Sequence, residues 1–167
     1  MNVGMETCAH LEEKEHGRES EEMTALWKTI NEKDSINLIA VKKILDERGW
    51  LGPEVVGGRG NTTLFLVIQH ADLETQEHYL PMMREAVKNG KARGSSLALL
   101  EDRVAMRNGK EQIYGSQIHR KEDGSFYVND LQEPEYVNQR RAEVGLGPIE
   151  EYVKHWGMEW TVPQKSK

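Results

Sequence analysis

The residues best suited to chemistry stand at the end of an apolar run, Leu64-Phe-Leu-Val-Ile-Gln-His-Ala-Asp72. An imidazole presented by an apolar helix, with a carboxylate nearby, can have its pKa tuned for proton transfer. His70 is therefore a candidate general acid/base, oriented by Asp72 or by the more distant Asp102. The alternative is structural: Asp72 caps a helix, and His70 is a hydrogen-bonded structural histidine.

Three successive charges, Glu101-Asp102-Arg103, follow the apolar residues 97–100. They point in different directions around a helix, so at least one turns toward the core and needs a partner. Arg103 could hold a carboxylate or a phosphate. The alternative, which the spacing does not exclude, is a salt bridge that ties helices together.

Residues 112–117, Gln-Ile-Tyr-Gly-Ser-Gln, offer neutral groups for recognising a substrate. Gly115 inside a strand pattern indicates a bulge or the close approach of another backbone or a ligand. A bent edge strand with a packed tyrosine is the structural alternative. Arg140 could reach an anionic ligand from a later helix, or face solvent or pair with acids. The predicted site comprises His70, Asp72 and Asp102 as catalytic residues, and Gln69, Arg103, Gln112, Tyr114, Gln117 and Arg140 as substrate-binding residues.

A metal site is conceivable where His70, Glu74 and His78 recur every four residues. On one continuous helix they would share a face and could bind zinc. If Asp72 is an N-cap, however, the helix is interrupted, so we expect no metal. There is also no Walker A loop, no G-x-G-x-x-G after a strand, no G-x-S-x-G elbow and no H-E-x-x-H, and we expect no cofactor.

Helices must position most of these groups. Apolar periodicity predicts a helix over 20–33 and a second helix that is capped by Asp34–Ser35 and ended by Gly49. The glycine-rich residues 50–60 are predicted to be a loop, which could form the lid of a site. Further helices are predicted with caps at Asn61–Thr62, at Asp72 and at Ser95–Ser96. The later elements are strands over 112–119 and 125–130, joined by a turn at 121–124, and helices opened by Pro134 and Pro148.

The predicted fold class is therefore mainly α (α+β), a compact bundle of short helices with one late β-hairpin. We expect a single globular domain over 20–160, between a flexible N-terminal tail, 1–19, and a polar C-terminal tail, 161–167.

Composition narrows the class of partner. The 167 residues carry a net charge of −6, and the short basic runs lie among acids, so we expect no nucleic-acid binding. No apolar run approaches the length of a membrane span, and no secretory signal precedes the domain, so we expect no membrane association and a cytoplasmic location. Cys8 is the only cysteine, which excludes an intramolecular disulfide.

Four motifs in a fixed order resemble a family of uncharacterised bacterial proteins, classed as a domain of unknown function. They are Gln-His-Ala-Asp at 69–72, Leu-Ala-Leu-Leu-Glu-Asp-Arg at 97–103, residues 112–117 and Arg-Arg-Ala-Glu-Val-Gly-Leu at 140–146. The resemblance implies a bacterial source and a shared pocket for these polar groups, but no activity.

Two hypotheses for function follow. The first is a small hydrolase or transferase that acts on a small polar or anionic molecule, with His70 as general acid/base. The second is a non-enzymatic module that binds a protein or peptide, in which the same polar residues form a structural network.

Overall fold

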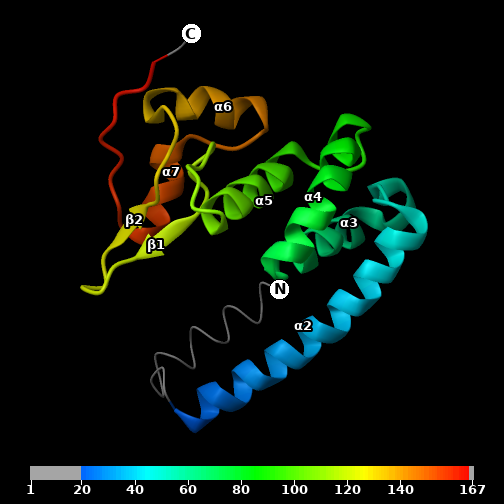
Figure 1. Ribbon diagram of the computed structural model, residues 1–167. Helices are drawn as coiled ribbons and strands as arrows, with labels where there is room; N and C mark the ends of the chain where they lie inside the picture. Colours follow the sequence, from blue (N-terminus) through cyan, green and yellow to red (C-terminus); the bar gives the residue numbers. More distant parts are fainter. Residues whose placement is uncertain (1–19, 166–167) are drawn as a thin grey trace. The chain divides into compact units, whose positions relative to one another are not determined.

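The computed structural model describes residues 20–165, which form two compact units, one up to Ala71 and one from Asp72 onward (Figure 1). Helices dominate, and one two-stranded antiparallel sheet lies late in the chain. The prediction of a mainly α fold with a late hairpin is confirmed. The predicted tail at 1–19, with Cys8, lies outside the described residues, and the prediction of a single domain stays a prediction.

The first unit begins with α2 (Glu21–Arg48), one helix of 28 residues where the sequence predicted two. The predicted cap at Asp34–Ser35 is wrong, since α2 continues through both residues. The Ser35 hydroxyl donates to the carbonyl of Asn31, one turn back in the same helix. Gly49 ends the helix as predicted, with a φ of 68° and its N–H bonded to Leu45.

The predicted loop over 50–60 is mostly the start of α3 (Pro53–His70). Pro53 occupies the first turn, where its missing N–H costs nothing. Gly57, with a φ of 70°, breaks the helical geometry, and the helix resumes beyond it. Asn61 is therefore not an N-cap; its side chain donates instead to the carbonyl of Leu51. The predicted end of the apolar helix at His70 is confirmed.

The second unit opens with α4 (Leu73–Lys88), which packs against α5 (Gly94–Arg107). Asp72 caps α4 as predicted, accepting the N–H of Thr75 at 2.7 Å. Pro81 lies inside α4, which continues past it to Lys88. The predicted start of α5 at Ser95–Ser96 is late, since the helix begins at Gly94.

The hairpin is shorter than predicted: β1 (Ile118–Arg120) pairs antiparallel with β2 (Phe126–Val128). The turn at 121–124 is confirmed by the bond from the Gly124 N–H to the Lys121 carbonyl. Residues 113–117 are irregular, with only a single bridge from Gln112 to Leu131 before β1.

Short helices follow: η1 (Pro134–Tyr136), α6 (Val137–Glu143), α7 (Ile149–Val153) and η2 (Lys154–Trp156). As predicted, η1 begins at Pro134 and α7 begins directly after Pro148. Val137, Ile149 and Val153 form a buried apolar cluster that β1, β2 and residues 158–160 help to cover. None of the described helices combines the length and the apolar character that crossing a bilayer requires.

Candidate functional site

Asp102 is fully buried in α5, and its carboxylate binds backbone rather than another side chain. One oxygen accepts the N–H groups of Ile113 at 2.7 Å and Tyr114 at 3.0 Å, and the other accepts that of Ser116 at 2.8 Å. Over residues 113–116, this cradle replaces the ladder bonds of the strand that was predicted over 112–119. The segment is therefore a fixed loop.

Two glutamines complete the loop from inside. Gln112, fully buried, accepts the N–H of Gln117 at 2.7 Å and donates to its carbonyl at 3.0 Å. The Gln117 side chain in turn accepts Nε–H of Arg103 at 2.9 Å. Both amides are thus engaged within the protein.

One face of α5 holds the whole segment. Leu99, Asp102, Arg103 and Met106 recur at helical spacing, and each contacts a residue between 113 and 119. The last contact joins Met106 Sδ to His119 Nε2 at 2.7 Å. The helix therefore aligns the loop and the first strand together.

Two adjacent arginines fix the other side of the loop. Arg140 donates to the carbonyl of Ile113 at 2.8 Å and also to the carbonyl of Gln132. Arg141, 2% exposed, donates to the carbonyl of Tyr114 at 2.8 Å and lies 4.9 Å from the ring centroid of Tyr152. Burial lowers the pKa of the Arg141 guanidinium below its ordinary value. Electrostatic interactions with Tyr152, Asp102 and Glu150 oppose this shift.

Two tyrosines border this network. The Tyr152 hydroxyl donates to the carbonyl of Ser116 at 2.7 Å, and burial raises the pKa of Tyr152. Burial and the negative charges of Glu101 and Asp102 raise the pKa of Tyr114. Glu101 itself pairs with Arg84 of α4 at 2.8 Å.

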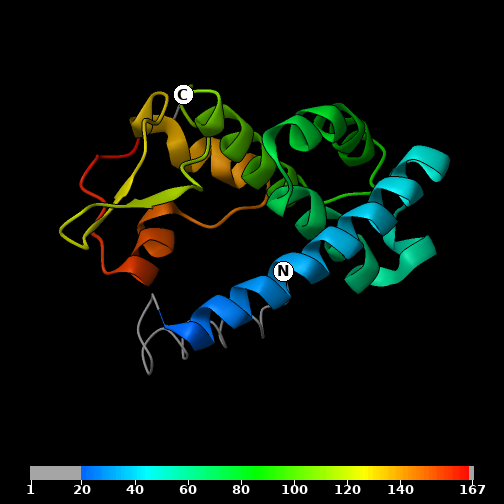
Figure 2. The ribbon, with the colours of Figure 1, turned by 60° about the horizontal axis from the view of Figure 1, so that its bottom comes forward.

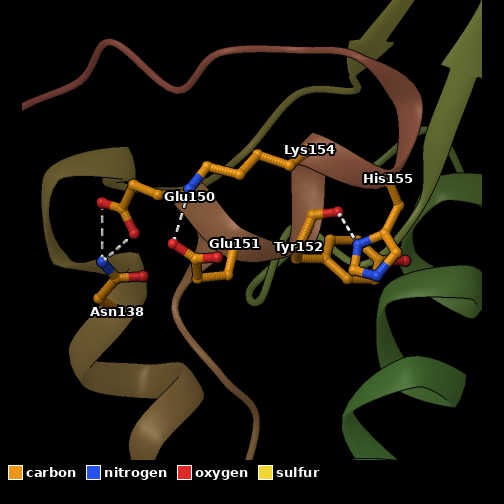
Figure 3. Close-up of polar contacts among 6 residues, drawn as sticks. All are labelled: Asn138, Glu150, Glu151, Tyr152, Lys154 and His155. Carbon is orange, nitrogen blue, oxygen red and sulfur yellow. Dashed lines mark hydrogen bonds and ion pairs between the residues drawn. The ribbon is translucent and has the colours of Figure 1, made fainter.

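Asn138 locks α6 to α7 (Figure 3). Its amide donates to both carboxylate oxygens of Glu150, at 3.0 and 2.7 Å, and its oxygen accepts the N–H of Ile149 at 2.8 Å. At the far end, the His155 ring contacts the carbonyl of Tyr152 at 2.9 Å. Hydrogen bonds therefore attach α7, which leads to Trp156, to α6.

A hollow of about 680 Å³ lies between β2 and residues 156–162, which run alongside it in both ribbon views (Figures 1 and 2). Its wall is largely apolar and aromatic. The lining residues of this kind are Phe126, Tyr127, Val128, Val153, Trp156, Met158 and Trp160. We call this hollow the aromatic groove. Its volume falls in the range usual for ligand sites.

The predicted site residues divide between the two units. Gln69 and His70 end α3 of the first unit. The structure brings together Asp102, Arg103, Gln112, Tyr114, Gln117 and Arg140 around the loop 112–117. Asp72 lies at the start of α4 as its cap. Within residues 20–165, no three His, Cys, Asp or Glu side chains are grouped so that they could hold a metal ion.

Sequence reasoning missed the aromatic groove. The available signal was the alternation of Trp156, Met158 and Trp160, which is typical of an extended segment packed on one side. It also missed Tyr152 and Asn138, whose partners are distant in the chain and carry no local pattern.

Comparison with curated proteins and with solved structures found no significant match. A family model described as a family of unknown function, DUF6624, matches residues 13–162 and so covers both units. The chain therefore belongs to the DUF6624 family.

Proposed function

We propose that this DUF6624 protein is a peptide-binding module, in which an extended segment of a partner lies in the aromatic groove and pairs with the outer edge of β2. The observation that carries the proposal is the aromatic groove beside an unpaired strand edge. Strand addition of this kind combines backbone hydrogen bonds with pockets for alternate side chains.

The register identifies the free edge. Lys121 N–H bonds to the Ser125 carbonyl at 2.7 Å, and Arg120 lies opposite Phe126. Because antiparallel pairs alternate between bonded and non-bonded, the backbone groups of Phe126 and Val128 point away from β1. No other segment within residues 20–165 takes them up, and no β1 residue is among those that line the groove.

The polar network also supports a binding module. Asp102, Gln112, Gln117 and Arg140 direct their hydrogen bonds to the protein's own loop, as expected for structural residues. The assignment of His70 as the general acid/base of a hydrolase or transferase stays a prediction. So do the bacterial source and the cytoplasmic location.

The strength of binding can be bounded. Two residues of β2 offer four outward backbone groups, each worth about 0.5–1.5 kcal/mol net, and association costs offset part of this. Because these bonds contribute at most about 6 kcal/mol before that cost, we expect weak binding, with dissociation constants of about 0.1 mM or higher.

The test uses an array of capped octapeptides with Val, Ile, Leu or Phe at alternate positions and Thr or Lys between them. The variant Phe126→Pro removes one outward donor at an edge position where proline is tolerated, and Phe126→Val keeps that donor. We expect wild type and Phe126→Val to bind the array and Phe126→Pro to lose binding, with circular dichroism confirming that all three fold. No capture by the wild type, or unchanged capture by Phe126→Pro, would refute the proposal.

A further inference from the structure

Residues 159–163, which we call the strap, close one side of the aromatic groove and are held at their ends. Before the strap, Met158 N–H bonds to the Val153 carbonyl at 3.3 Å. After it, Gln164 accepts the N–H of Asn138 at 3.1 Å and donates to the carbonyl of Pro134 at 3.0 Å. No backbone N–H of the strap donates a hydrogen bond to any residue of 20–165. The carbonyl of Val162 accepts from the Gln164 side chain at 3.1 Å, and no other backbone group of the strap is hydrogen-bonded within residues 20–165, so residues 159–161 can shift without breaking a backbone hydrogen bond.

Trp160, in the middle of the strap, carries an unsatisfied donor. Its ring lines the groove and packs on the cluster of Val137, Ile149 and Val153. Its indole N–H is shielded from solvent, and no acceptor lies within reach among residues 20–165. A buried donor without an acceptor is costly, so an acceptor supplied by a bound molecule would remove a cost that this N–H otherwise carries.

We infer that Trp160 recognises the backbone of the bound peptide: when a peptide enters the groove, the strap shifts and the indole N–H donates to a peptide carbonyl. The inference rests on the proposed function and adds to it the residue that reads the occupant. Because the N–H is shielded from solvent, contact with a bound peptide requires the shift that the end-held strap permits. A carbonyl suits this donor because every peptide of the proposed class carries one at each residue.

The test replaces Trp160 by 3-benzothienylalanine, which keeps the ring shape and exchanges the N–H for sulfur. Trp50, whose indole N–H is also buried without an acceptor but which does not line the groove, receives the same replacement as the matched control. The probe is a fluorescein-labelled octapeptide of alternating Val and Lys. We expect Trp160→3-benzothienylalanine to weaken binding about tenfold, and Trp50→3-benzothienylalanine to change it by less than about twofold.

A spectroscopic readout separates recognition from packing. In the ¹⁵N-labelled wild type, the indole N–H resonance of Trp160, assigned from its absence in Trp160→Phe, should move downfield when the Val/Lys octapeptide is added. The melting temperature of Trp160→3-benzothienylalanine should not fall, because the lost donor had no partner in the empty groove.

The outcomes distinguish the two proposals. If the wild type captures no peptide from the array, both fail. If capture occurs and is lost in Phe126→Pro, but the Trp160 replacement binds as tightly as wild type or no more weakly than the Trp50 replacement, only the inference about Trp160 is overturned.

Discussion

At the scale of the residue, the carboxylate of Asp102 determines the path of the loop. A charge buried at 0% exposure is tolerated only when hydrogen bonds replace its hydration, and here three backbone N–H groups do so. The same bonds explain why residues 113–117 do not continue the strand: their donors are already used.

Replacing Asp102 by Asn tests this role. The variant Asp102→Asn turns an NH₂ group toward at least one N–H and removes the charge, so we expect the free energy of unfolding to fall by about 2–3 kcal/mol. The neighbouring Glu101→Gln removes the charge that pairs with the half-exposed Arg84 and acts on Tyr114, and keeps a side chain that can still hydrogen-bond, so it should cost less than about 1 kcal/mol. Urea denaturation measures both, and equal losses would contradict the special role of Asp102.

Tyr152 gives the stability a dependence on alkaline pH. Because burial raises its pKa in the folded state, the stabilisation is complete below the unfolded value of about 10 and is lost as pH rises through the folded pKa. At pH 7, Tyr152→Phe should lose about 1 kcal/mol with the bond to Ser116. Urea midpoints from pH 8 to 11 should show the wild type losing its advantage above pH 10, and a constant difference would refute the assignment.

The sequence indicated that one of the charges 101–103 would turn inward and need a partner, and Asp102 does. It could not indicate that the partner would be backbone, because N–H groups are present at every residue and leave no pattern in the sequence. The same limit applies to Arg140 and Arg141, whose hydrogen bonds in the loop region go to carbonyl oxygens.

At the scale of the element, Gly115 combines two constraints. Its φ of 65° lies in the left-handed region, and an added Cβ would lie 2.9 Å from Ile149 Cδ1. The sequence predicted a bulge or the close approach of another backbone or a ligand at this glycine, but the neighbours are instead side chains of the apolar core, those of Ile149, Leu131 and Val128.

A pair of glycine variants separates the two constraints. Gly109 has a φ of 67° with nothing within 4 Å of an added Cβ, so Gly109→Ala should cost only the backbone strain, about 1 kcal/mol. Gly115→Ala adds a clash in the core and should cost about 3 kcal/mol in total. Thermal and urea unfolding check both, and equal costs would show that Ile149 yields freely.

Prediction of the elements succeeded where a single residue determines the local geometry. Gly49 and Asp72 ended and started helices as expected. Prediction failed where a residue type can either cap a helix or bond to a backbone carbonyl from inside it. Ser35 and Asn61 were predicted as caps, but their side chains donate to backbone carbonyls instead. Caps and interior bonds use the same residue types, so the sequence alone does not separate them.

At the scale of the whole molecule, the DUF6624 match extends over both compact units. The aromatic groove and the Asp102 network both belong to the second unit. They are connected by the hydrogen bond from the Tyr152 hydroxyl of α7 to the carbonyl of Ser116 in the loop. The groove is thus joined by a hydrogen bond to the loop that Asp102 holds.

The face of α5 that carries Leu99, Asp102, Arg103 and Met106 has an evolutionary consequence. Each residue added to or removed from a helix rotates everything beyond it by about 100°. A single insertion or deletion between Leu99 and Met106 would therefore turn part of this face away from the segment that it aligns. Relatives that keep the loop must keep that interval at a constant length, whatever else in their sequences has diverged.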